Sequence, residues 1–532
     1  MDLFHRLSET FSSKRNVAVT GVMLVIFLFA IDATIVSTSM PTIVARLGGL
    51  DLYSWIFSIY MLTSALTTPI FGKLSDLFSR RRLMLVGIGI FVTGSALCGA
   101  AQSMEMMIVF RALQGLGGGA IYALSFIIVG VLYTHEQRAR MQGIISSIWG
   151  IASILGPLAG GIIVEHWSWR WIFFVNLPIT AVACALIVFG LKEEAAEKRR
   201  PKLDLSGAAL LMVALVLLFY ALSEGAHAGR TLNSALVSTV GVAFFVLAVF
   251  FVVEKRAEEP LVPPNLFSLK LFRNSVVVSI AAAMGVFGAL TYIPLYLQGV
   301  LGMSASHAGS ILLLLSLSWT GGSLLSGHWV HRTGYRLAAS AGMILLAGGY
   351  ALLISHSQIG IMLILCSAVM IGIGMGFANL TTLVAAQSAV SRERIGVATS
   401  TIMLLRSIGG ALVVSVMGTV LLNRMQSGLA AVSANIGKTV PASVMEIARN
   451  PQDLLDPAIR GNIPPDLLPL LTNVLARATW SAFLIGFVLM LCGLAASLLI
   501  ERHASERSIA ESSVPNGDRS APVELRSPSS EF

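Results

Sequence analysis

Two ionisable side chains lie deep inside apolar stretches of this sequence. Asp32 falls within the apolar run 17–40, and Arg111 falls within the run 107–131. A charged side chain at such depth in a membrane costs about 2.5–3.5 kcal/mol on insertion scales, and such residues usually line a cavity or a proton route. Because arginine stays protonated in proteins, Arg111 can only influence a neighbouring group. Asp32 is therefore a candidate for lining a cavity or a proton route; a purely structural role is the alternative for both residues.

A dense group of charges marks the turn 72–82, Gly-Lys-Leu-Ser-Asp-Leu-Phe-Ser-Arg-Arg-Arg. One acid and four bases so close together cannot lie inside hydrocarbon, so the chain must leave the membrane here between two spanning helices. The candidate functional residues of this turn are Gly72, Asp76, Arg80, Arg81 and Arg82. The segment 327–336 repeats the pattern in part, with Gly334 kept and His331 where the acid would be. We therefore expect the later part of the chain to repeat the earlier part.

The apolar run 142–164 contains several glycines and one proline. Pro157 removes one helical hydrogen bond and kinks a helix, and glycines let neighbouring helices approach closely in lipid. The pattern Gly-x-x-x-x-x-Gly-Pro-x-x-Gly-Gly consists of Gly150, Gly156, Pro157, Gly160 and Gly161. We expect these residues to form a small-residue face on one spanning helix.

The composition requires lipid around the elements that carry these residues. Hydrophobic residues make up 55% of the chain, charged residues 12%, and the mean hydropathy is +0.81. A soluble domain has about 25% charged residues. Apolar runs of spanning length fall at 17–40, 53–71, 83–101, 107–131, 142–164, 171–190, 205–223, 234–253, 275–297, 308–330, 337–355, 359–386, 396–421 and 479–500. None has the alternating polarity of a membrane barrel, so the sequence predicts an all-α integral membrane protein with fourteen transmembrane helices.

The distribution of Lys and Arg predicts the orientation of these helices. If the N-terminus is cytoplasmic, the inner segments carry twenty-six basic residues, whereas the six short outer loops carry three. Cytoplasmic loops of membrane proteins collect Lys and Arg, so we expect both termini inside. The net charge of +9 then reflects the basic cytoplasmic loops of a membrane protein, and no nucleic-acid partner is expected. The outer loops lack an Asn-x-Ser/Thr sequon, which favours a bacterial inner membrane.

The polar breaks between the apolar runs divide the chain into five parts. We expect a cytoplasmic N-terminal segment (1–16), an N-terminal six-helix half (17–190), two linker helices with flanking cytoplasmic loops (191–274), a C-terminal six-helix half (275–500) that includes a long outer loop (422–478), and a disordered cytoplasmic tail (501–532). The tail is rich in Ser, Pro, Glu and Arg, a composition typical of disorder.

These motifs resemble those of the major facilitator superfamily, in particular its fourteen-helix drug:proton antiporter branch. Residues 72–82 resemble the loop between helices 2 and 3 of that family, with Ser79 where the family usually has glycine. Residues 30–41, which surround Asp32, resemble the helix 1 signature of the drug:proton antiporters. In that family the matching Asp takes part in proton coupling.

Three further segments carry the same resemblance. Arg111-Ala-Leu-Gln114-Gly resembles the helix 4 signature, which places this arginine in the proton pathway. Residues 150–161 resemble the antiporter motif of exporters, and this is the main reason to expect export rather than uptake. Arg406 lies in an Arg-x-x-Gly-Gly element similar to one in the fourteen-helix branch, where cavity lining and structural pairing stay equally open.

The resemblance implies a fold and a mechanism. The fold is two six-helix halves plus two additional central helices. The mechanism is drug:proton antiport by alternating access, with Asp32 and Arg111 in proton coupling and the turn 72–82 as a conformational latch that can reach lipid phosphates. The substrates would be hydrophobic and in some cases cationic drugs or toxic compounds, exported across the plasma membrane by a monomer.

A substrate cavity would be lined by polar and aromatic side chains from several helices. The candidates are Gln114, Tyr122, Trp149, Tyr292, Trp319, Asn379 and Arg406. Each aromatic residue has the alternative of facing lipid or packing inside the protein. The run 308–330 contains no acid, which gives less support to a specialist for dications.

Other classes of protein find less support. An ATP-driven pump needs Gly-x-x-x-x-Gly-Lys-Ser/Thr, and the Gly-Lys-Thr at 437–439 has Val432 where the first glycine belongs. No cluster of His, Asp or Glu suggests an enzyme, and no cofactor or metal is expected, since the driving force is a proton gradient. An exporter of a lipid, siderophore or metabolite, a proton-coupled uptake symporter and a non-transporting sensor stay open as alternatives.

Overall fold

All regular secondary structure in the described part of the chain is helical. The computed structural model describes residues 14–133, 135–191, 205–227, 234–257, 260, 262–356, 359–391, 394–436, 460, 463, 465 and 467–501. The earlier helices are α2 (Lys14–Leu47), α3 (Tyr53–Leu77), α4 (Arg80–Ala100), α5 (Met104–Leu132), α6 (His135–His166), α7 (Trp171–Phe174) and α8 (Asn176–Gly190). The later helices are α9 (Leu205–His227), α10 (Ser234–Arg256), α11 (Lys270–Gly299), α12 (Ala305–Thr333), α13 (Tyr335–Leu353), α14 (Ile361–Ser388), α15 (Ile395–Ile436) and α18 (Leu468–Ser497). Short 3₁₀ turns cover Leu50–Leu52 and Pro264–Ser268.

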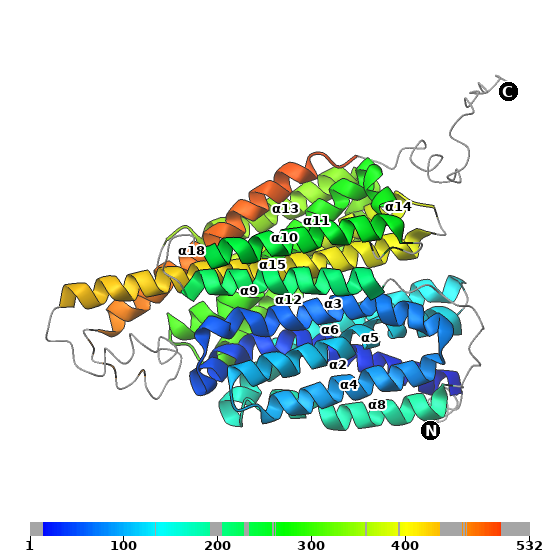
Figure 1. Cartoon of the computed structure of the whole chain (residues 1–532), viewed down its shortest axis with the longest axis horizontal. Coiled ribbons are helices and arrows are strands. Elements are labelled where there is room, and N and C mark those ends of the chain that lie inside the picture. The colour runs from blue at the N-terminus through cyan, green and yellow to red at the C-terminus, as the bar shows by residue number, and fades with distance from the viewer. Residues whose placement is uncertain are drawn as a thin grey trace, which may run out of the picture.

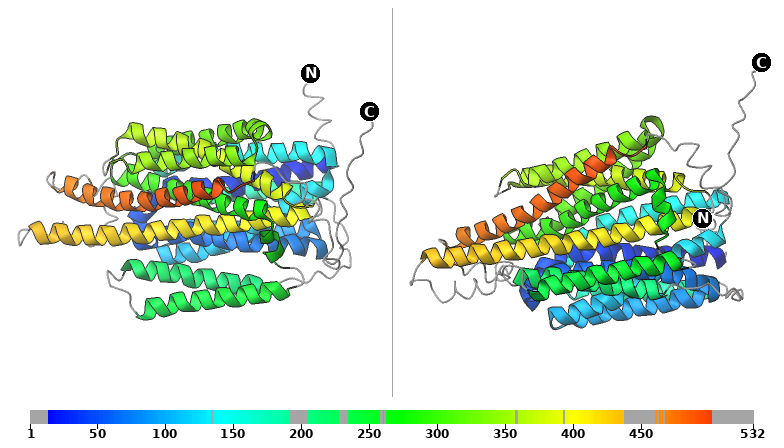
Figure 2. Two further views of the ribbon diagram at one scale, coloured as in Figure 1. Left: turned by 90° about the horizontal axis from the view of Figure 1, so that it is seen from above. Right: turned by 45° about the horizontal axis from the view of Figure 1, so that its top comes forward.

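The helices form two groups that lie side by side. Helices α2 to α8 form the lower group in Figure 1, and α11 to α18 form the other group, most of it in the upper part of the picture; α12 lies at the level of α3 and packs against both α6 and α14. We call these groups the first and second halves. The pair α9–α10 lies against one side of the bundle (Figure 2), where α9 packs against α3 and α15.

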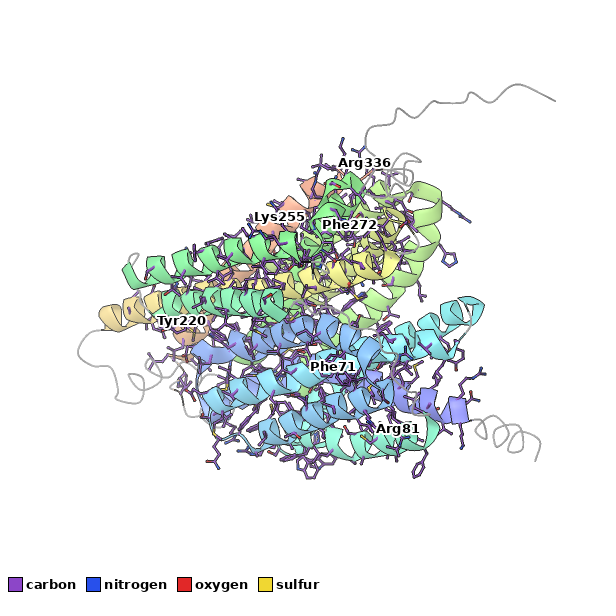
Figure 3. All side chains as sticks on the ribbon, turned by 45° about the vertical axis from the view of Figure 1, so that its right-hand side comes forward. Phe71, Arg81, Tyr220, Lys255, Phe272 and Arg336 are labelled. Atoms are coloured by element: carbon purple, nitrogen blue, oxygen red, sulfur yellow. The ribbon has the colours of Figure 1, made fainter. Side chains whose placement is uncertain are left out.

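Successive long helices run in opposite directions between two ends of the bundle (Figure 1). We call the end with Lys14 and Ile500 the termini end, and the end with residues 48–52 the first-loop end. Basic side chains such as Lys255 and Arg336 are exposed at the outside of the bundle near the termini end (Figure 3). The described chain therefore enters and leaves the bundle at the same end.

Twelve helices of the described residues are long and apolar enough to cross a membrane. This number corrects the fourteen spans that the sequence analysis predicts. The two other predicted spans fall on α6 and α9, where the apolar stretches of described residues, Gly150–His166 and Ser206–Leu218, are shorter than a span requires. The prediction of an all-helical, multi-pass membrane protein is confirmed.

Local sequence chemistry explains where several helices begin. The hydroxyl groups of Ser79, Ser103 and Ser304 accept hydrogen bonds from backbone N–H groups in the first turns of α4, α5 and α12. Such N-caps satisfy donors that have no partner within the helix. Gly334, between α12 and α13, has a φ of 82°, which favours glycine. Ser79, at the equivalent turn of the first half, has a φ of −53° and needs no glycine.

The two halves are joined at the first-loop end. One large cluster of buried residues contains Met40 and Tyr53 of the first half together with Tyr292 and Leu421 of the second. Hydrogen bonds cross the same boundary: the Tyr53 hydroxyl donates to the Thr291 carbonyl at 2.7 Å, and Gln298 Nε2 donates to the Thr38 carbonyl at 3.0 Å. This end of the boundary is therefore both apolar and hydrogen-bonded.

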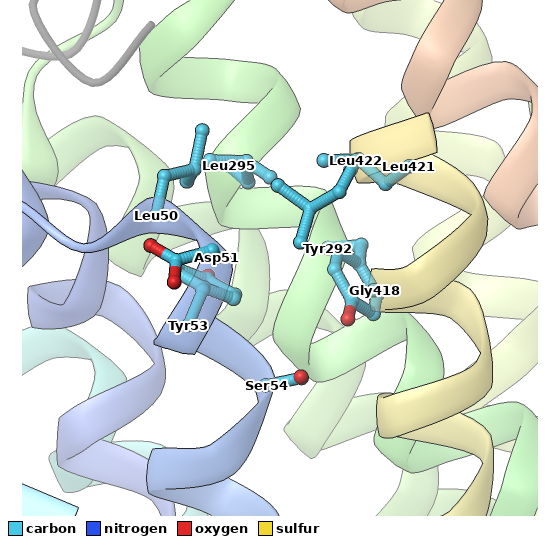
Figure 4. Close-up of a pocket in the computed structure, with 9 residues that line it drawn as sticks. All are labelled: Leu50, Asp51, Tyr53, Ser54, Tyr292, Leu295, Gly418, Leu421 and Leu422. Atoms are coloured by element: carbon cyan, nitrogen blue, oxygen red, sulfur yellow. The ribbon is translucent and has the colours of Figure 1, made fainter. Parts of the chain in front are cut away.

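Little space remains between the halves at this end. Figure 4 shows Tyr53 and Ser54 on one side of a small pocket, with Tyr292, Gly418 and Leu422 on the other. Its volume is about 10 Å³, close to the smallest cavity that holds a single water molecule. A solute could not pass here without a movement of the two halves.

Candidate functional site

Asp32 and Arg111 form a buried ion pair inside the first half. Arg111 Nη1 lies 2.8 Å from Asp32 Oδ2, which brings together residues of α2 and α5. The exposed fractions are 0% for Asp32 and 1% for Arg111. Because charges away from water need a partner, this arrangement explains how both side chains are tolerated in apolar helices. The structure brings together the two residues that the sequence analysis assigned to proton coupling.

Gln114 completes a closed hydrogen-bonded ring with this pair. Its Nε2 donates to Asp32 Oδ1 at 2.8 Å, and its Oε1 accepts from Arg111 Nη1 at 2.8 Å. Gln114 is fully buried, so in this structure it belongs to the ion-pair cluster. We call Asp32, Arg111 and Gln114 the carboxylate cluster. Both oxygens of the carboxylate thus accept a hydrogen bond.

Two further side chains complete the surroundings of the carboxylate cluster. The Arg111 guanidinium carbon lies 3.9 Å from the centre of the Tyr60 ring. A cation over an aromatic face in a desolvated site contributes about 2 kcal/mol. The Cys98 thiol points to Gln114 Oε1 at 3.7 Å. The sequence analysis did not connect Tyr60 or Cys98 with this site, because they lie on α3 and α4 and only packing brings them here.

Glycines in α5 allow the neighbouring helices to come this close. A Cβ added at Gly115 or Gly119 would collide with α3, and one added at Gly117 would collide with α4. Gly94 of α4 lies against the backbone of Gln114. A Cβ atom added at Gly94 would lie only 2.6 Å from the Cα atom of Gln114. Since packing drives helix association in lipid, these glycines position the carboxylate cluster.

The turn 72–82 lies at the termini end. Gly72 and the backbone of Asp76 belong to the last turns of α3, and Arg80, Arg81 and Arg82 form the first turn of α4. The side chain of Asp76 lies outside the described part of the structure. Arg82 is exposed, and Arg80 and Arg81 are partly exposed. The carboxylate cluster consists of Asp32, Arg111 and Gln114 and shares no residue with this turn.

The glycine and proline motif of α6 lies between the two halves. A Cβ at Gly156 would collide with Thr34 of α2, and one at Gly160 would collide with Thr38. On another side, a Cβ at Gly161 would come within 2.6 Å of the Ala305 carbonyl oxygen of α12. Pro157 packs against Gly309, which also belongs to α12. The motif therefore lets α6 contact its own half and the opposite half at once.

The residues predicted to line a cavity do not all lie in one place. Tyr292 is fully buried at the first-loop end, where its hydroxyl donates to the Val414 carbonyl at 2.5 Å. Trp319 of α12 is partly buried and packs against the large buried cluster that both halves share. Gly150 lies beside Thr320 of α12, but the side chain of its neighbour Trp149 is outside the described residues.

Tyr122, Asn379 and Arg406 form a second group at the boundary between the halves. The Tyr122 hydroxyl of α5 lies 3.2 Å from the sulfur of Met403 in α15. Arg406 Nη1, one turn along α15, donates to the side-chain oxygen of Asn379 in α14. All three are partly exposed. In the described residues, no group of three or more His, Cys, Asp or Glu side chains is arranged to hold a metal ion.

Solved structures share this fold. The chain superposes on the "Crystal Structure of A Bacterial Homolog to Human Lysosomal Transporter, Spinster, in Inward-facing And Unoccupied Conformation" with a TM-score of 0.68. The match covers 95% of this chain and 100% of that one at 15% sequence identity, so it supports the fold alone.

Sequence relatives and a family model give the family. The chain is 34% identical over 507 residues to "Multidrug transporter protein MdtP" of Bacillus subtilis (strain 168), which covers 92% of this chain and 93% of that protein. It is also 34% identical to "Multidrug resistance protein 3" of the same organism, over 88% of this chain and 92% of that protein. The "MFS-type efflux pump LUC4" of Fusarium sp is 32% identical, over 78% of this chain and 75% of that protein. The model described as Major Facilitator Superfamily matches residues 22–414. The membership predicted from the motifs is thus confirmed: this membrane transporter belongs to the Major Facilitator Superfamily.

Proposed function

We propose that this protein is a proton-coupled exporter of hydrophobic toxic compounds. The observation that carries the proposal is the carboxylate cluster, because a proton that binds Asp32 would break its ion pair with Arg111 between α2 and α5, and release of the proton would restore that pair. The names of the relatives, two of them multidrug proteins and one an efflux pump, support the export of drugs.

Alternating access explains how the cluster drives transport. In this proposal the first-loop end faces the outside of the plasma membrane, and the hydrogen bonds of Tyr53 and Gln298 close it. The opposite, cytoplasmic end would then admit substrate. Protonation of Asp32 from outside would break its ion pair with Arg111, and release of the proton inside would restore it. The latch at 72–82 would stabilise the outward-open state, with Arg80 to Arg82 at lipid phosphates.

Both ends of the chain are cytoplasmic in this proposal, and the fourteen-helix branch remains the proposed subgroup. Helices α6 and α9 also run between the two ends of the bundle (Figure 1), as a membrane-spanning role requires. The pair α9–α10, which lies beside the two halves, would supply the two additional helices. The protein would act as a monomer and use no cofactor.

The energy of one proton is sufficient for useful export. Moving one charge through 100 mV yields about 2.3 kcal/mol. Each 1.36 kcal/mol corresponds to about a tenfold ratio, so one proton sustains roughly a fifty-fold gradient of a neutral compound. ATP is not needed for a gradient of this size.

The test is proton-driven transport by the Asp32→Asn variant in proteoliposomes. Asparagine keeps the size of the side chain but cannot bind a proton, so efflux driven by a pH gradient should fall to the level of empty vesicles. Glu105→Gln is the matched control, because Glu105 is an exposed acid on α5, the helix of Arg111. Full pH-driven efflux by a correctly folded Asp32→Asn protein would show that Asp32 has no role in coupling.

A further inference from the structure

Arg406 is a cation in the first third of α15, and no acid among the described residues lies beside it. The six long helices of the second half, α11 to α15 and α18, contain no Asp or Glu residue. In the described part of the chain no carboxylate lies within 4 Å of Arg406. Its hydrogen-bond partner is the neutral side chain of Asn379. The helices of its own half therefore contain no acid that could neutralise Arg406.

The contrast with Arg111 shows how unusual this arrangement is. Arg111 is fully buried, and its charge is met by Asp32 at 2.8 Å. Arg406 is partly exposed at the boundary between the halves. Its side-chain hydrogen-bond partner in the described residues is the neutral amide group of Asn379. An unpaired charge inside a membrane is costly, and such residues usually face a pathway or a ligand. Arg406 thus satisfies the condition for a ligand-binding cation, whereas Arg111 does not.

Aromatic side chains of the first half lie opposite Arg406. The Tyr122 hydroxyl lies 3.2 Å from the sulfur of Met403, which precedes Arg406 by one turn of α15. The Tyr122 ring is 5.4 Å from Phe29 and 5.0 Å from Phe126, measured between ring centres. These rings form an aromatic surface that comes from α2 and α5. A ligand that touches this surface with its apolar body would have its polar end near Arg406.

We propose that Arg406 and Asn379 bind the anionic group of an aromatic organic anion, while Phe29, Tyr122 and Phe126 bind its rings. The inference rests on the proposed export function and adds the charge of the preferred substrate. A carboxylate or sulfonate would pair with the guanidinium through charge-assisted hydrogen bonds. A cationic compound in the same position would meet an uncompensated positive charge and would be repelled.

Two fluorescent probes that differ in one group test this inference. The first is 1-anilinonaphthalene-8-sulfonate, whose sulfonate is permanently ionised. The second is N-phenyl-1-naphthylamine, which has the same rings without the charge. Binding to purified wild-type protein in detergent and pH-driven transport in proteoliposomes are measured for both. We expect the wild type to bind the sulfonate at least ten-fold more tightly than Arg406→Gln does, and to bind the uncharged probe equally in both proteins.

Further variants separate charge from folding. Arg406→Lys should keep part of the preference for the sulfonate. Asn379→Asp places a carboxylate beside Arg406, which should fold well through the new ion pair and should abolish the preference by occupying the cation. Arg424→Gln is the matched control, since it removes the same charge from an exposed position on the same helix, and it should bind both probes as the wild type does.

The outcomes distinguish the substrate class from the transport function. If Arg406→Gln weakens binding of both probes equally, or if Asn379→Asp retains the preference for the sulfonate, the anion site is wrong. A wild-type protein that binds the cationic dye ethidium more tightly than the sulfonate probe would also overturn it. Absence of pH-driven transport of any probe, with intact sulfonate binding that depends on Arg406, would instead count against the proposed export function.

Discussion

At the scale of single residues, the sequence predicted which charges matter better than it predicted their partners. Asp32 and Arg111 stood out because a charge inside an apolar run is costly, and this cost depends only on neighbours along the chain. Gln114 is 82 positions from Asp32, and its hydrogen bond to the carboxylate depends on how α2 and α5 pack. The same applies to Tyr60, which the sequence analysis did not connect with Arg111.

The hydrogen bond from Gln114 to the charged carboxylate of Asp32 should stabilise the folded protein. In Gln114→Leu, Asp32 Oδ1 loses its hydrogen-bond donor, and an unsatisfied buried polar group costs about 1–3 kcal/mol. We expect the free energy of unfolding in detergent to fall by this amount. In an Asp32→Asn background the same substitution should cost less, because hydrogen bonds to charged groups are roughly twice as strong as neutral ones. Equal costs in both backgrounds would mean that Gln114 does not interact with the carboxylate in solution.

At the scale of helices, small residues determine which elements can touch. The glycine pattern of α6 predicted one small-residue face, and the structure reveals that Gly156 and Gly160 face α2 while Gly161 faces α12. Sequence spacing could not assign these partners, since glycine has no side chain that selects a neighbour. The number of spans was also less certain than the fold class: α6 and α9 have shorter apolar stretches among the described residues than the predicted runs.

Two glycines of α6 offer a matched test of this packing. In Gly156→Ala the added methyl group would collide with Thr34, so α2 and α6 would have to separate. Overpacking of this kind typically costs about 1–3 kcal/mol, and we expect lower thermal stability and weaker efflux. In Gly150→Ala the methyl group meets only Thr320, at 3.4 Å, which is an ordinary contact. That variant should match the wild type; equal loss in both proteins would show that the contact between Gly156 and α2 does not determine the effect.

At the scale of the whole molecule, the partial repeat of the turn 72–82 at 327–336 predicted a second half that resembles the first. The two groups of helices agree with this expectation (Figure 1). The sequence did not predict that the halves would be joined at the first-loop end. That state depends on a balance between alternative contacts of two similar surfaces, and no local pattern encodes such a balance.

The hydrogen bond from Tyr53 to the Thr291 carbonyl should help to keep the first-loop end closed. Tyr53→Phe removes this bond between the halves, and one such bond contributes about 0.5–1.5 kcal/mol. We therefore expect the ratio of open to closed molecules to rise by about 2–12-fold. Spin labels at positions 106 and 362, which are exposed near the first-loop end of the two halves, report this change as a longer distance in double electron–electron resonance. The four native cysteines are first replaced by alanine.

Tyr350→Phe provides the control for this experiment. The Tyr350 hydroxyl also donates to a buried carbonyl, that of Gly285 at 2.6 Å, but both residues belong to the second half. Its loss should lower stability without changing the distance between the labels, because the bond does not differ between open and closed arrangements of the halves. If both variants lengthen the distance equally, general loosening of the bundle explains the result. A change in Tyr53→Phe alone would identify the contact between α3 and α11 as part of the gate at this end.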